Sequence, residues 1–147
     1  MKKMILVLSA LALLGACSTA PANDTERNRK VIADFARIFY AEKDVKRAFE
    51  TYVVPNYVQH NPGIADGRDA AVAALTPMFS APGAKFEVKR IVVDRDHAVI
   101  HLFGRGDPKT PGAAVADIYR LKDGKIVEHW DVLQPMPAKS ANPHPMF

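Results

Sequence analysis

Four runs of strand-forming residues follow one another in the second half of this chain and restrict the folds that it can adopt. They cover residues 86–95, 98–105, 113–121 and 126–133. Turn residues such as Asp96, Gly106 and Gly124 separate these runs. Neighbouring strands joined by turns form an antiparallel meander, so the second half of the chain predicts an antiparallel sheet.

Three helical segments precede this sheet, and each has apolar residues on one side. The expected elements are a helix that begins at Asn23 or Asp24 and reaches Phe39, a helix from Asp44 to before Pro55, a brief strand at 57–60, and a helix at 68–79 with a kink at Pro77. Helices that precede an antiparallel meander in the sequence are typical of an α+β domain. We expect three N-terminal helices to pack on a strongly curved antiparallel sheet, which then forms a cone with a central pocket.

Residues 1–16 are predicted to be a lipoprotein signal peptide and not part of the fold. Lys2 and Lys3 give a positive start, and the apolar run at 4–14 is too short to span a membrane as a mature helix. The following LGAC sequence at 14–17 resembles the lipobox of bacterial lipoproteins, in which the cysteine is lipidated and becomes the new N-terminus. Alternatively, Cys17, the only cysteine, is an ordinary residue beside a cleavage site.

Lipidation at Cys17 would anchor the protein to a membrane. Residues 17–23 then form a lipidated tether, a single domain follows at 24–135, and a proline-rich tail occupies 136–147. Ser18 resembles the residue at this position in lipoproteins that are sent to the outer membrane of Gram-negative cells. We therefore expect a protein of the bacterial cell envelope, attached to the outer membrane and facing the periplasm.

The charge of the chain gives little support to nucleic-acid binding. Its formal net charge is +4 at pH 7, and Lys2 and Lys3 of the leader account for part of this value. The sequence has no block of lysine or arginine and no aromatic platform between basic residues. We expect no nucleic-acid partner.

The register of the last hairpin decides which side chains share a face. A two-residue Asp123-Gly124 turn would place Asp117 opposite Trp130, whereas a three-residue loop at 122–124 would place it opposite His129. We favour the three-residue loop, because it gives one face a coherent apolar wall. That face then carries Asp117, Tyr119, His129 and Asp131, together with Val115, Val127 and Leu133.

Two carboxylates in an apolar pocket cannot both ionise without a penalty, so one is expected to act as a base and the other to hold a proton. This arrangement suits removal of a proton beside a carbonyl group, which needs a base and a donor for the developing enolate oxygen. Asp131 is the candidate base, and Tyr119, His129 or protonated Asp117 is the candidate donor. The alternative is that Asp131 merely ends the strand or forms an ion pair at its edge.

Further polar residues are candidates for substrate contacts. His60 and Asn61 are expected at the mouth of the pocket, with a capped turn as the alternative. His101 either lines the pocket or is a core histidine, and Trp130 either contacts substrate or packs at an interface. The alternative is a metal held by His60, His101 and His129 with a carboxylate, but no pair has a local ligand spacing, so we expect no metal.

Two segments, YVQHNPGIADGRDA at 57–70 and DIYRLKDGKIVEHWDVLQ at 117–134, resemble the SnoaL-like branch of the nuclear transport factor 2-like superfamily. The resemblance implies a cone-shaped fold and a homodimer that forms through the outer face of the sheet. It also implies that Asp131 is the acid/base of an aldol condensation that uses no metal or cofactor, as in the polyketide cyclases of this branch. Asp117 stands where those cyclases carry a histidine.

Two functional hypotheses are therefore consistent with the sequence. The first is a cofactor-free acid/base enzyme of the isomerase, aldol cyclase or lyase type that acts on a small hydrophobic carbonyl compound. The second is a lipid-anchored binding module that holds a small apolar ligand or a protein without catalysis. Loss of turnover in an Asp131→Asn variant would favour the first.

Overall fold

The computed structural model describes residues 20–147, with side chains from Asp24 onward. The elements are α1 (Ala20–Ala36), the π-helical turn η1 (Arg37–Ala41), α2 (Val45–Tyr52), β1 (Val53–Gln59), α3 (Arg68–Ser80), β2 (Lys85–Asp94), β3 (His97–Arg105), β4 (Ala113–Lys122) and β5 (Lys125–Pro135). The predicted leader and Cys17 lie outside the described residues. Within the described residues, no helix is both long enough and apolar enough to cross a membrane.

The sheet has five strands in the order β1-β5-β4-β3-β2. Strands β2 to β5 form the predicted antiparallel meander, whereas β1 adds to the free edge of β5 in parallel. Pro55 lies inside β1, where the register between Val53 and Val58 is irregular. An edge strand tolerates this proline, because the missing N–H is not needed by a second neighbour. The first strand is thus longer than the predicted 57–60, and its parallel pairing with β5 was not predicted.

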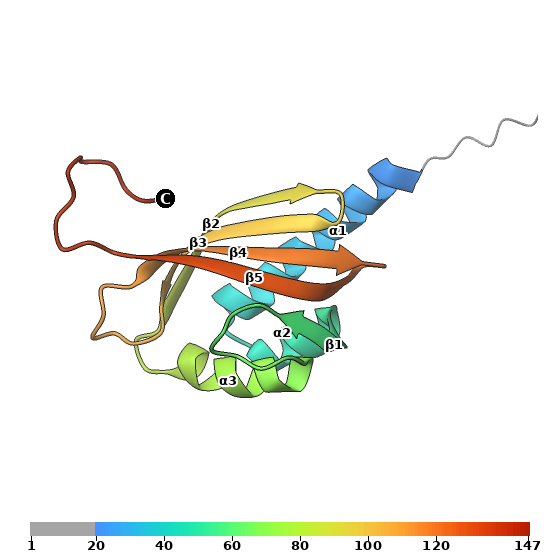
Figure 1. Cartoon of the computed structure of the whole chain (residues 1–147), viewed down its shortest axis with the longest axis horizontal. Coiled ribbons are helices and arrows are strands. Elements are labelled where there is room, and N and C mark those ends of the chain that lie inside the picture. The colour runs from blue at the N-terminus through green and yellow to red at the C-terminus, as the bar shows by residue number, and fades with distance from the viewer. Residues whose placement is uncertain (1–19) are drawn as a thin grey trace, which may run out of the picture.

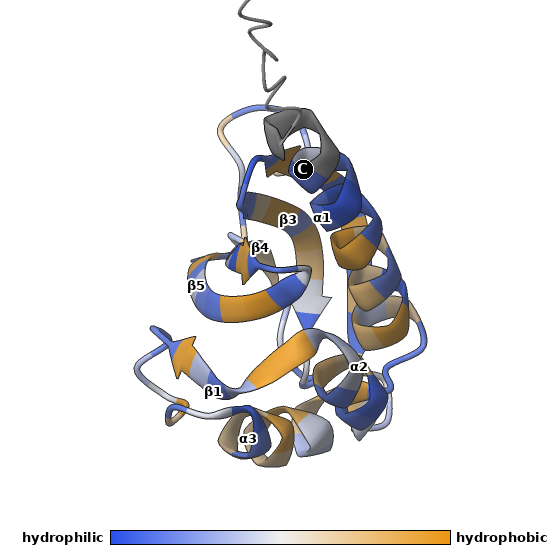
Figure 2. Cartoon of the chain, turned by 90° about the vertical axis from the view of Figure 1, so that its right-hand side faces the viewer, coloured by the Kyte–Doolittle hydropathy of each residue, from blue (hydrophilic) through white to orange (hydrophobic). Residues whose placement is uncertain are grey.

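The helices cover the concave face of the curved sheet (Figures 1 and 2). The apolar residues Ile32 and Phe35 of α1 are fully buried and recur at helical spacing, so α1 packs through one stripe. Asp44 caps α2, because its side chain accepts a hydrogen bond from the main-chain N–H of Arg47 at 3.1 Å. The α+β prediction of three helices on a strongly curved sheet is confirmed.

The hairpin between β4 and β5 differs from the favoured register. Lys122 pairs with Lys125, so the turn has only two residues, Asp123 and Gly124, which have positive φ angles of 52° and 74°. Between this turn and the pair Arg120–Glu128, Val127 is an extra residue in β5, a β-bulge. Without the bulge, a two-residue turn would pair Asp117 with Trp130 and put Asp131 on the opposite face. The extra residue shifts the register by one, so Asp117 and Asp131 face the same side.

Because of this bulge, Asp117 lies opposite Asp131, and Tyr119 lies opposite His129. The expected three-residue loop and the pairing of Asp117 with His129 were wrong. The four side chains nevertheless share one face, as predicted, because the register error is two residues and leaves the alternation unchanged.

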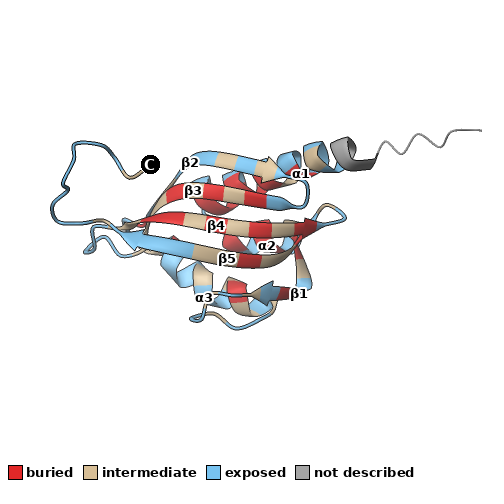
Figure 3. Cartoon of the chain, turned by 45° about the horizontal axis from the view of Figure 1, so that its top comes forward, coloured by how far each residue is buried: buried red, intermediate tan, exposed pale blue. Residues whose placement is uncertain are grey.

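The buried residues of the sheet concentrate in β3 and β4, while the distal end of β5 is exposed (Figure 3). Residues 136–147 turn back toward the outer face of the sheet (Figure 1). There the Phe147 ring lies 6.1 Å from the ring of His101 and 5.8 Å from that of Phe103. The concave face is thus left for the helices and for the cavity between them and the sheet.

Candidate active site in the cone

A cavity of about 410 Å³ lies between α3, η1 and the concave face of the sheet. Most of its wall is apolar, with Phe39, Phe79, Phe86, Leu102 and Leu133 among the lining residues. A cavity of this size suits a small organic molecule. The curvature of the sheet creates this space, because the helices cannot fill a concave surface at its open end.

Polar side chains enter the cavity from four parts of the fold. They are Tyr40 from η1, Gln59 and Asn61 at the end of β1, Asp117 and Tyr119 from β4, and His129 and Asp131 from β5. Strand alternation places residues 117 and 119, and likewise 129 and 131, on one face. The parallel addition of β1 to β5 then brings Gln59 beside His129, its register partner.

Asp117 is buried and holds the centre of a hydrogen-bond network. The Tyr40 hydroxyl donates to Oδ2 of Asp117 at 2.5 Å, and the hydroxyls of Tyr40 and Tyr119 lie 2.7 Å apart. The other oxygen, Oδ1, lies 3.2 Å from Nε2 of His129. Both oxygens of this buried carboxyl group therefore have partners, as a buried polar group requires.

His129 is also buried, and its second ring nitrogen has a partner on β1. Its Nδ1 lies 2.9 Å from Oε1 of Gln59. The amide nitrogen of Gln59 in turn donates to the Tyr57 hydroxyl at 3.1 Å. The imidazole is thus held at both ends, which fixes the plane of the ring within the cavity wall.

Asp131 is less buried than Asp117 and is held separately. The side-chain amide of Asn61 donates to Oδ2 of Asp131 at 2.5 Å. Oδ1 of Asn61 accepts the main-chain N–H of Gly63 at 2.8 Å, so the turn after β1 fixes this amide. Asp131 is therefore positioned at the cavity wall, in reach of a bound molecule.

The three tyrosines around these acids are strongly perturbed. Burial, followed by the nearby charge of Asp117, raises the pKa of Tyr40 and of Tyr119 well above the ordinary value. The same two causes raise the pKa of Tyr57. All three remain neutral phenols at physiological pH and serve as hydrogen-bond donors or acceptors, not as bases.

One cluster within the described residues has the composition of a metal site. Asp117, His129 and Asp131 each offer one ligand atom, and these atoms lie within 4.8 Å of one another. Both ring nitrogens of His129 already have hydrogen-bond partners. A divalent ion would replace the contact between Nε2 of His129 and Asp117, so an ion and a shared proton are alternative occupants of this position.

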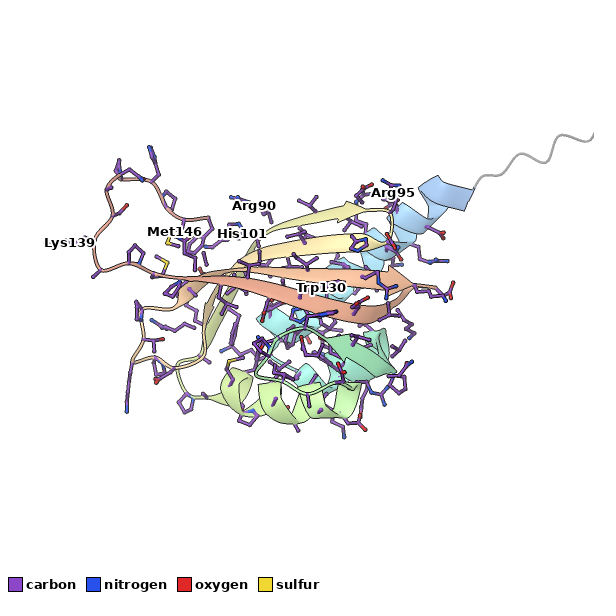
Figure 4. The ribbon with its side chains drawn as sticks, in the orientation of Figure 1. Arg90, Arg95, His101, Trp130, Lys139 and Met146 are labelled. Carbon is purple, nitrogen blue, oxygen red and sulfur yellow. The ribbon has the colours of Figure 1, made fainter. Side chains whose placement is uncertain are left out.

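Three predicted site residues lie outside the cavity. His60 stacks on Trp130 with ring centroids 4.6 Å apart, and its Nε2 lies 2.8 Å from Oε1 of Glu128. Trp130 faces outward because it alternates with His129 and Asp131, and His101 faces outward because it alternates with the buried Leu102 (Figure 4). The structure therefore does not place the predicted contact residues His60, His101 and Trp130 at the cavity. The predicted residues Asn61 and Tyr119 do line it.

Sequence reasoning missed Tyr40 and gave Gln59 no defined partner. Ile38, Phe39 and Tyr40 are all buried in η1, which a regular amphipathic helix would not achieve with three consecutive residues. The long apolar run at this helix end was the only available signal. Arg105 also lines the cavity, and its buried Nε has no hydrogen-bond partner within residues 20–147.

Fold and site together define a small α+β domain whose curved sheet encloses a cavity with acid and base groups on its wall. The chain belongs to the SnoaL-like domain family, whose match covers residues 32–129. This match confirms the family to which the two sequence segments pointed. None of the curated proteins matches the sequence.

Solved structures show the same fold at low sequence identity. TsrD from Streptomyces laurentii has a TM-score of 0.60 and 24% identity over 75% of this chain and 90% of that chain. A nuclear transport factor 2-like protein of unknown function from Mesorhizobium loti has a TM-score of 0.65 and 22% identity, over 75% of this chain and 93% of that chain. A candidate ketosteroid isomerase from Kribbella flavida DSM 17836 has a TM-score of 0.61 and 16% identity, over 83% of this chain and 85% of that chain. At these identities the similarity concerns the fold.

Proposed function

We propose that this protein is a cofactor-free acid/base enzyme that moves a proton on a small hydrophobic carbonyl compound, with Asp131 as the general base. The observation that carries this proposal is the pairing of Asp131 with Asp117 across β4 and β5 on the wall of a largely apolar cavity. Asp131 is held by an amide, while Asp117 is surrounded by hydroxyl and imidazole groups. Such different surroundings separate the roles of two neighbouring carboxyl groups.

The cavity offers the two functions that carbon-acid chemistry needs. A base must remove the proton beside the carbonyl group, and a donor must meet the oxygen on which negative charge develops. Asp131 provides the first function, and the group formed by Asp117, His129 and Tyr119 provides the second. The apolar wall favours a hydrophobic substrate and excludes water from the reacting atoms.

The names of two structural relatives agree with this reaction class. They include the candidate ketosteroid isomerase from Kribbella flavida and a SnoaL-like polyketide cyclase candidate from Jannaschia sp. CCS1. Both names imply proton transfer at carbon. Because these relatives are distant, they support the class of reaction and give no substrate.

The test follows proton exchange at carbon in deuterated buffer. A panel of apolar ketones and β-dicarbonyl compounds is incubated with the protein, and loss of the α-hydrogen signal is measured by NMR. We expect exchange with the wild type and none above background with Asp131→Asn, while the melting temperatures agree. Asp69→Asn is the matched control, because the side chain of Asp69 is 94% exposed on α3.

An equal exchange rate in Asp131→Asn would overturn the assignment of the base. Absence of exchange in the wild type, together with an apolar ligand that is retained unmodified through purification, would replace the enzyme with a binding module.

We also propose that the mature protein is anchored to the outer membrane through a lipid on Cys17 and faces the periplasm. The LGAC sequence at 14–17 and the preceding apolar run support this proposal. In a Gram-negative host fed radioactive palmitate, the wild type should carry the label and sediment with membranes. Cys17→Ser should lose both properties, and a labelled Cys17→Ser protein would contradict the proposal.

A further inference from the structure

The orientation of the Gln59 side chain is fixed by the main chain. The N–H of Asn61 donates to Oε1 of Gln59 at 3.0 Å, and a main-chain N–H can only donate. The amide nitrogen of Gln59 therefore points the other way, toward the Tyr57 hydroxyl. The atom that faces Nδ1 of His129 is thus the carbonyl oxygen, which can only accept.

This orientation determines where His129 carries its first proton. A contact of 2.9 Å between Nδ1 and a carbonyl oxygen is a hydrogen bond only if Nδ1 holds a hydrogen. In a neutral imidazole with a proton on Nδ1, the second nitrogen Nε2 is an acceptor. Yet Nε2 faces a carboxyl oxygen of Asp117 at 3.2 Å, and an ionised carboxylate is also only an acceptor.

In the metal-free protein, one additional proton therefore lies between His129 and Asp117. The pair is either an imidazolium with a carboxylate or an imidazole with a carboxylic acid, and both forms contain the same number of protons. The phenols do not supply it. Tyr40 uses its single hydrogen for Oδ2 of Asp117, so Tyr119 must donate to Tyr40, and neither hydrogen reaches Oδ1.

Asp131 requires no such proton. Oδ1 of Asn61 accepts the main-chain N–H of Gly63, so its amide nitrogen is the group that faces Asp131. An N–H donor favours the ionised carboxylate. The site thus has one carboxylate ready to accept a proton and, within 4.8 Å, one pair ready to give a proton.

We propose that Gln59 is a positioning residue that holds His129 in the form with a proton on Nδ1, so that His129 and Asp117 together carry one transferable proton and act as the general acid opposite Asp131. This inference rests on the proposed function for the role of the acid, and on hydrogen-bond polarity alone for its protonation. Strand patterns in the sequence do not predict the contact between Gln59 and His129, because it joins β1 to β5. They therefore do not predict that His129 and Asp117 share a proton.

The step balances without another reactant. The carbon–hydrogen bond beside the carbonyl breaks, and its proton goes to the Asp131 carboxylate. The electron pair moves to the carbonyl oxygen, which forms a bond to the proton of the pair. His129 is left neutral with its proton on Nδ1, and Asp117 is left as a carboxylate that still accepts from Tyr40.

The short distance between the base Asp131 and the acid pair His129–Asp117 limits which substrates can react. Because the atoms of Asp131, His129 and Asp117 lie within 4.8 Å, the acidic carbon and the oxygen that is protonated must be close neighbours in the same molecule. An enolisable ketone or a β-dicarbonyl compound meets this condition. A substrate that needs proton transfer between distant atoms does not.

The protonation of His129 is measured directly by NMR. The protein is labelled with ¹⁵N in its histidine rings, and His129→Gln identifies the signals of His129. The titratable or polar groups that face this ring are Tyr57 and Gln59 from β1, Asp117 and Tyr119 from β4, and Asp131 from β5, with Tyr40 of η1 behind Asp117. We expect Nδ1 to carry a proton in the wild type, because it faces the carbonyl oxygen of Gln59.

Gln59→Leu removes the acceptor and should allow His129 to place its proton on Nε2, facing Asp117. If the acid matters as proposed, kcat should fall by roughly 10²-fold with a smaller change in KM, and the acidic and basic limbs of the pH–rate profile should move. Gln59→Glu keeps an acceptor toward His129 and should retain the Nδ1 proton signal. Thermal melts establish that each variant is folded.

The outcomes separate this inference from the proposed function. An unprotonated Nδ1 in the wild type would overturn the inference whatever the activity. A Nδ1 proton that persists in folded Gln59→Leu would remove the positioning role of Gln59. The expected NMR signals without any carbon exchange by the wild type would sustain the proton assignment and defeat the proposed reaction.

Discussion

Asp117 and Asp131 lie directly opposite each other on β4 and β5, yet different parts of the fold hold their carboxyl groups. Asp117 accepts from Tyr40 of η1 and contacts His129, whereas Asp131 accepts from Asn61 after β1. Among the described residues, no hydrogen bond joins the two carboxyl groups to each other. Two neighbouring groups of the same type therefore meet different surroundings, which is how a site obtains an acid and a base from equal residues.

Asn61 and His60 are adjacent in sequence but should differ in their effect on turnover. Asn61→Ala removes the donor that positions Asp131, and loss of a hydrogen bond to a charged group is expected to lower kcat about tenfold or more. His60→Ala should stay within about twofold, because the side chain of His60 lies against Trp130 outside the cavity. Initial rates on the same substrate measure both. A larger loss in His60→Ala would show that the outer face contributes to the site.

The Tyr40 hydroxyl should contribute to stability as well as to the site. Tyr40→Phe leaves a buried oxygen of Asp117 without its donor, so the free energy of unfolding should fall by about 1–3 kcal/mol. Urea denaturation measures this change. Tyr52→Phe is the control and should differ from wild type by less than about 0.5 kcal/mol, because the Tyr52 hydroxyl makes no hydrogen bond within the described chain. Equal losses in both variants would contradict the network.

The cavity opening can be tested with two neighbouring residues of β5. Leu133 lines the cavity and is 55% exposed, whereas Val132 is 62% exposed and points to the other face. Leu133→Trp should weaken binding of an apolar fluorophore by about tenfold, because the larger ring occupies the mouth. Val132→Trp should bind like the wild type. A fluorescence titration gives both dissociation constants, and equal affinities would place the binding site elsewhere.

The lowered pKa of Glu128, on the outer face of the sheet, predicts that the stability of the fold depends on pH. The hydrogen bond from His60, followed by that from Arg120, lowers the pKa of Glu128 below its ordinary value of 4.5. Because the pKa is lower in the folded state, Glu128 stabilises the fold fully above about pH 4.5. This contribution is lost as the pH falls through the lowered pKa. Melting temperatures of wild type and Glu128→Gln should therefore differ near pH 6 and converge near pH 3.

The matched control for this measurement is Glu50→Gln on α2. The Glu50 side chain is 54% exposed, and in the described part of the chain its one ion pair is with Lys46, at 3.8 Å. An ion pair of this kind contributes little, so the difference from wild type should be small at every pH. A difference for Glu128→Gln that widens as the pH falls would contradict the sign of the predicted effect.

The register of the final hairpin shows where sequence patterns reach their limit. Alternation groups Asp117 with Tyr119 and His129 with Asp131, but the register decides whether the two groups share a face. The predicted shared face agrees with the structure, although the predicted loop does not. The pairing itself depends on the bulge at Val127, which no alternation pattern reveals. His60 and His101 show the same limit, because a residue beyond a strand end, or of uncertain parity, can face either side.

Local periodicity and turn residues in the sequence were enough to predict the α+β class and the order of helices and strands. The position of both acids on one wall also needs the bulge at Val127, which sets the register of β4 and β5. Only the tertiary structure decided that β1 joins β5 in parallel, that Tyr40 of η1 reaches Asp117, and that Gln59 reaches His129. These contacts join residues roughly 70 or more positions apart in the chain. They form only when the curved sheet closes over the helices, and no local pattern encodes that closure.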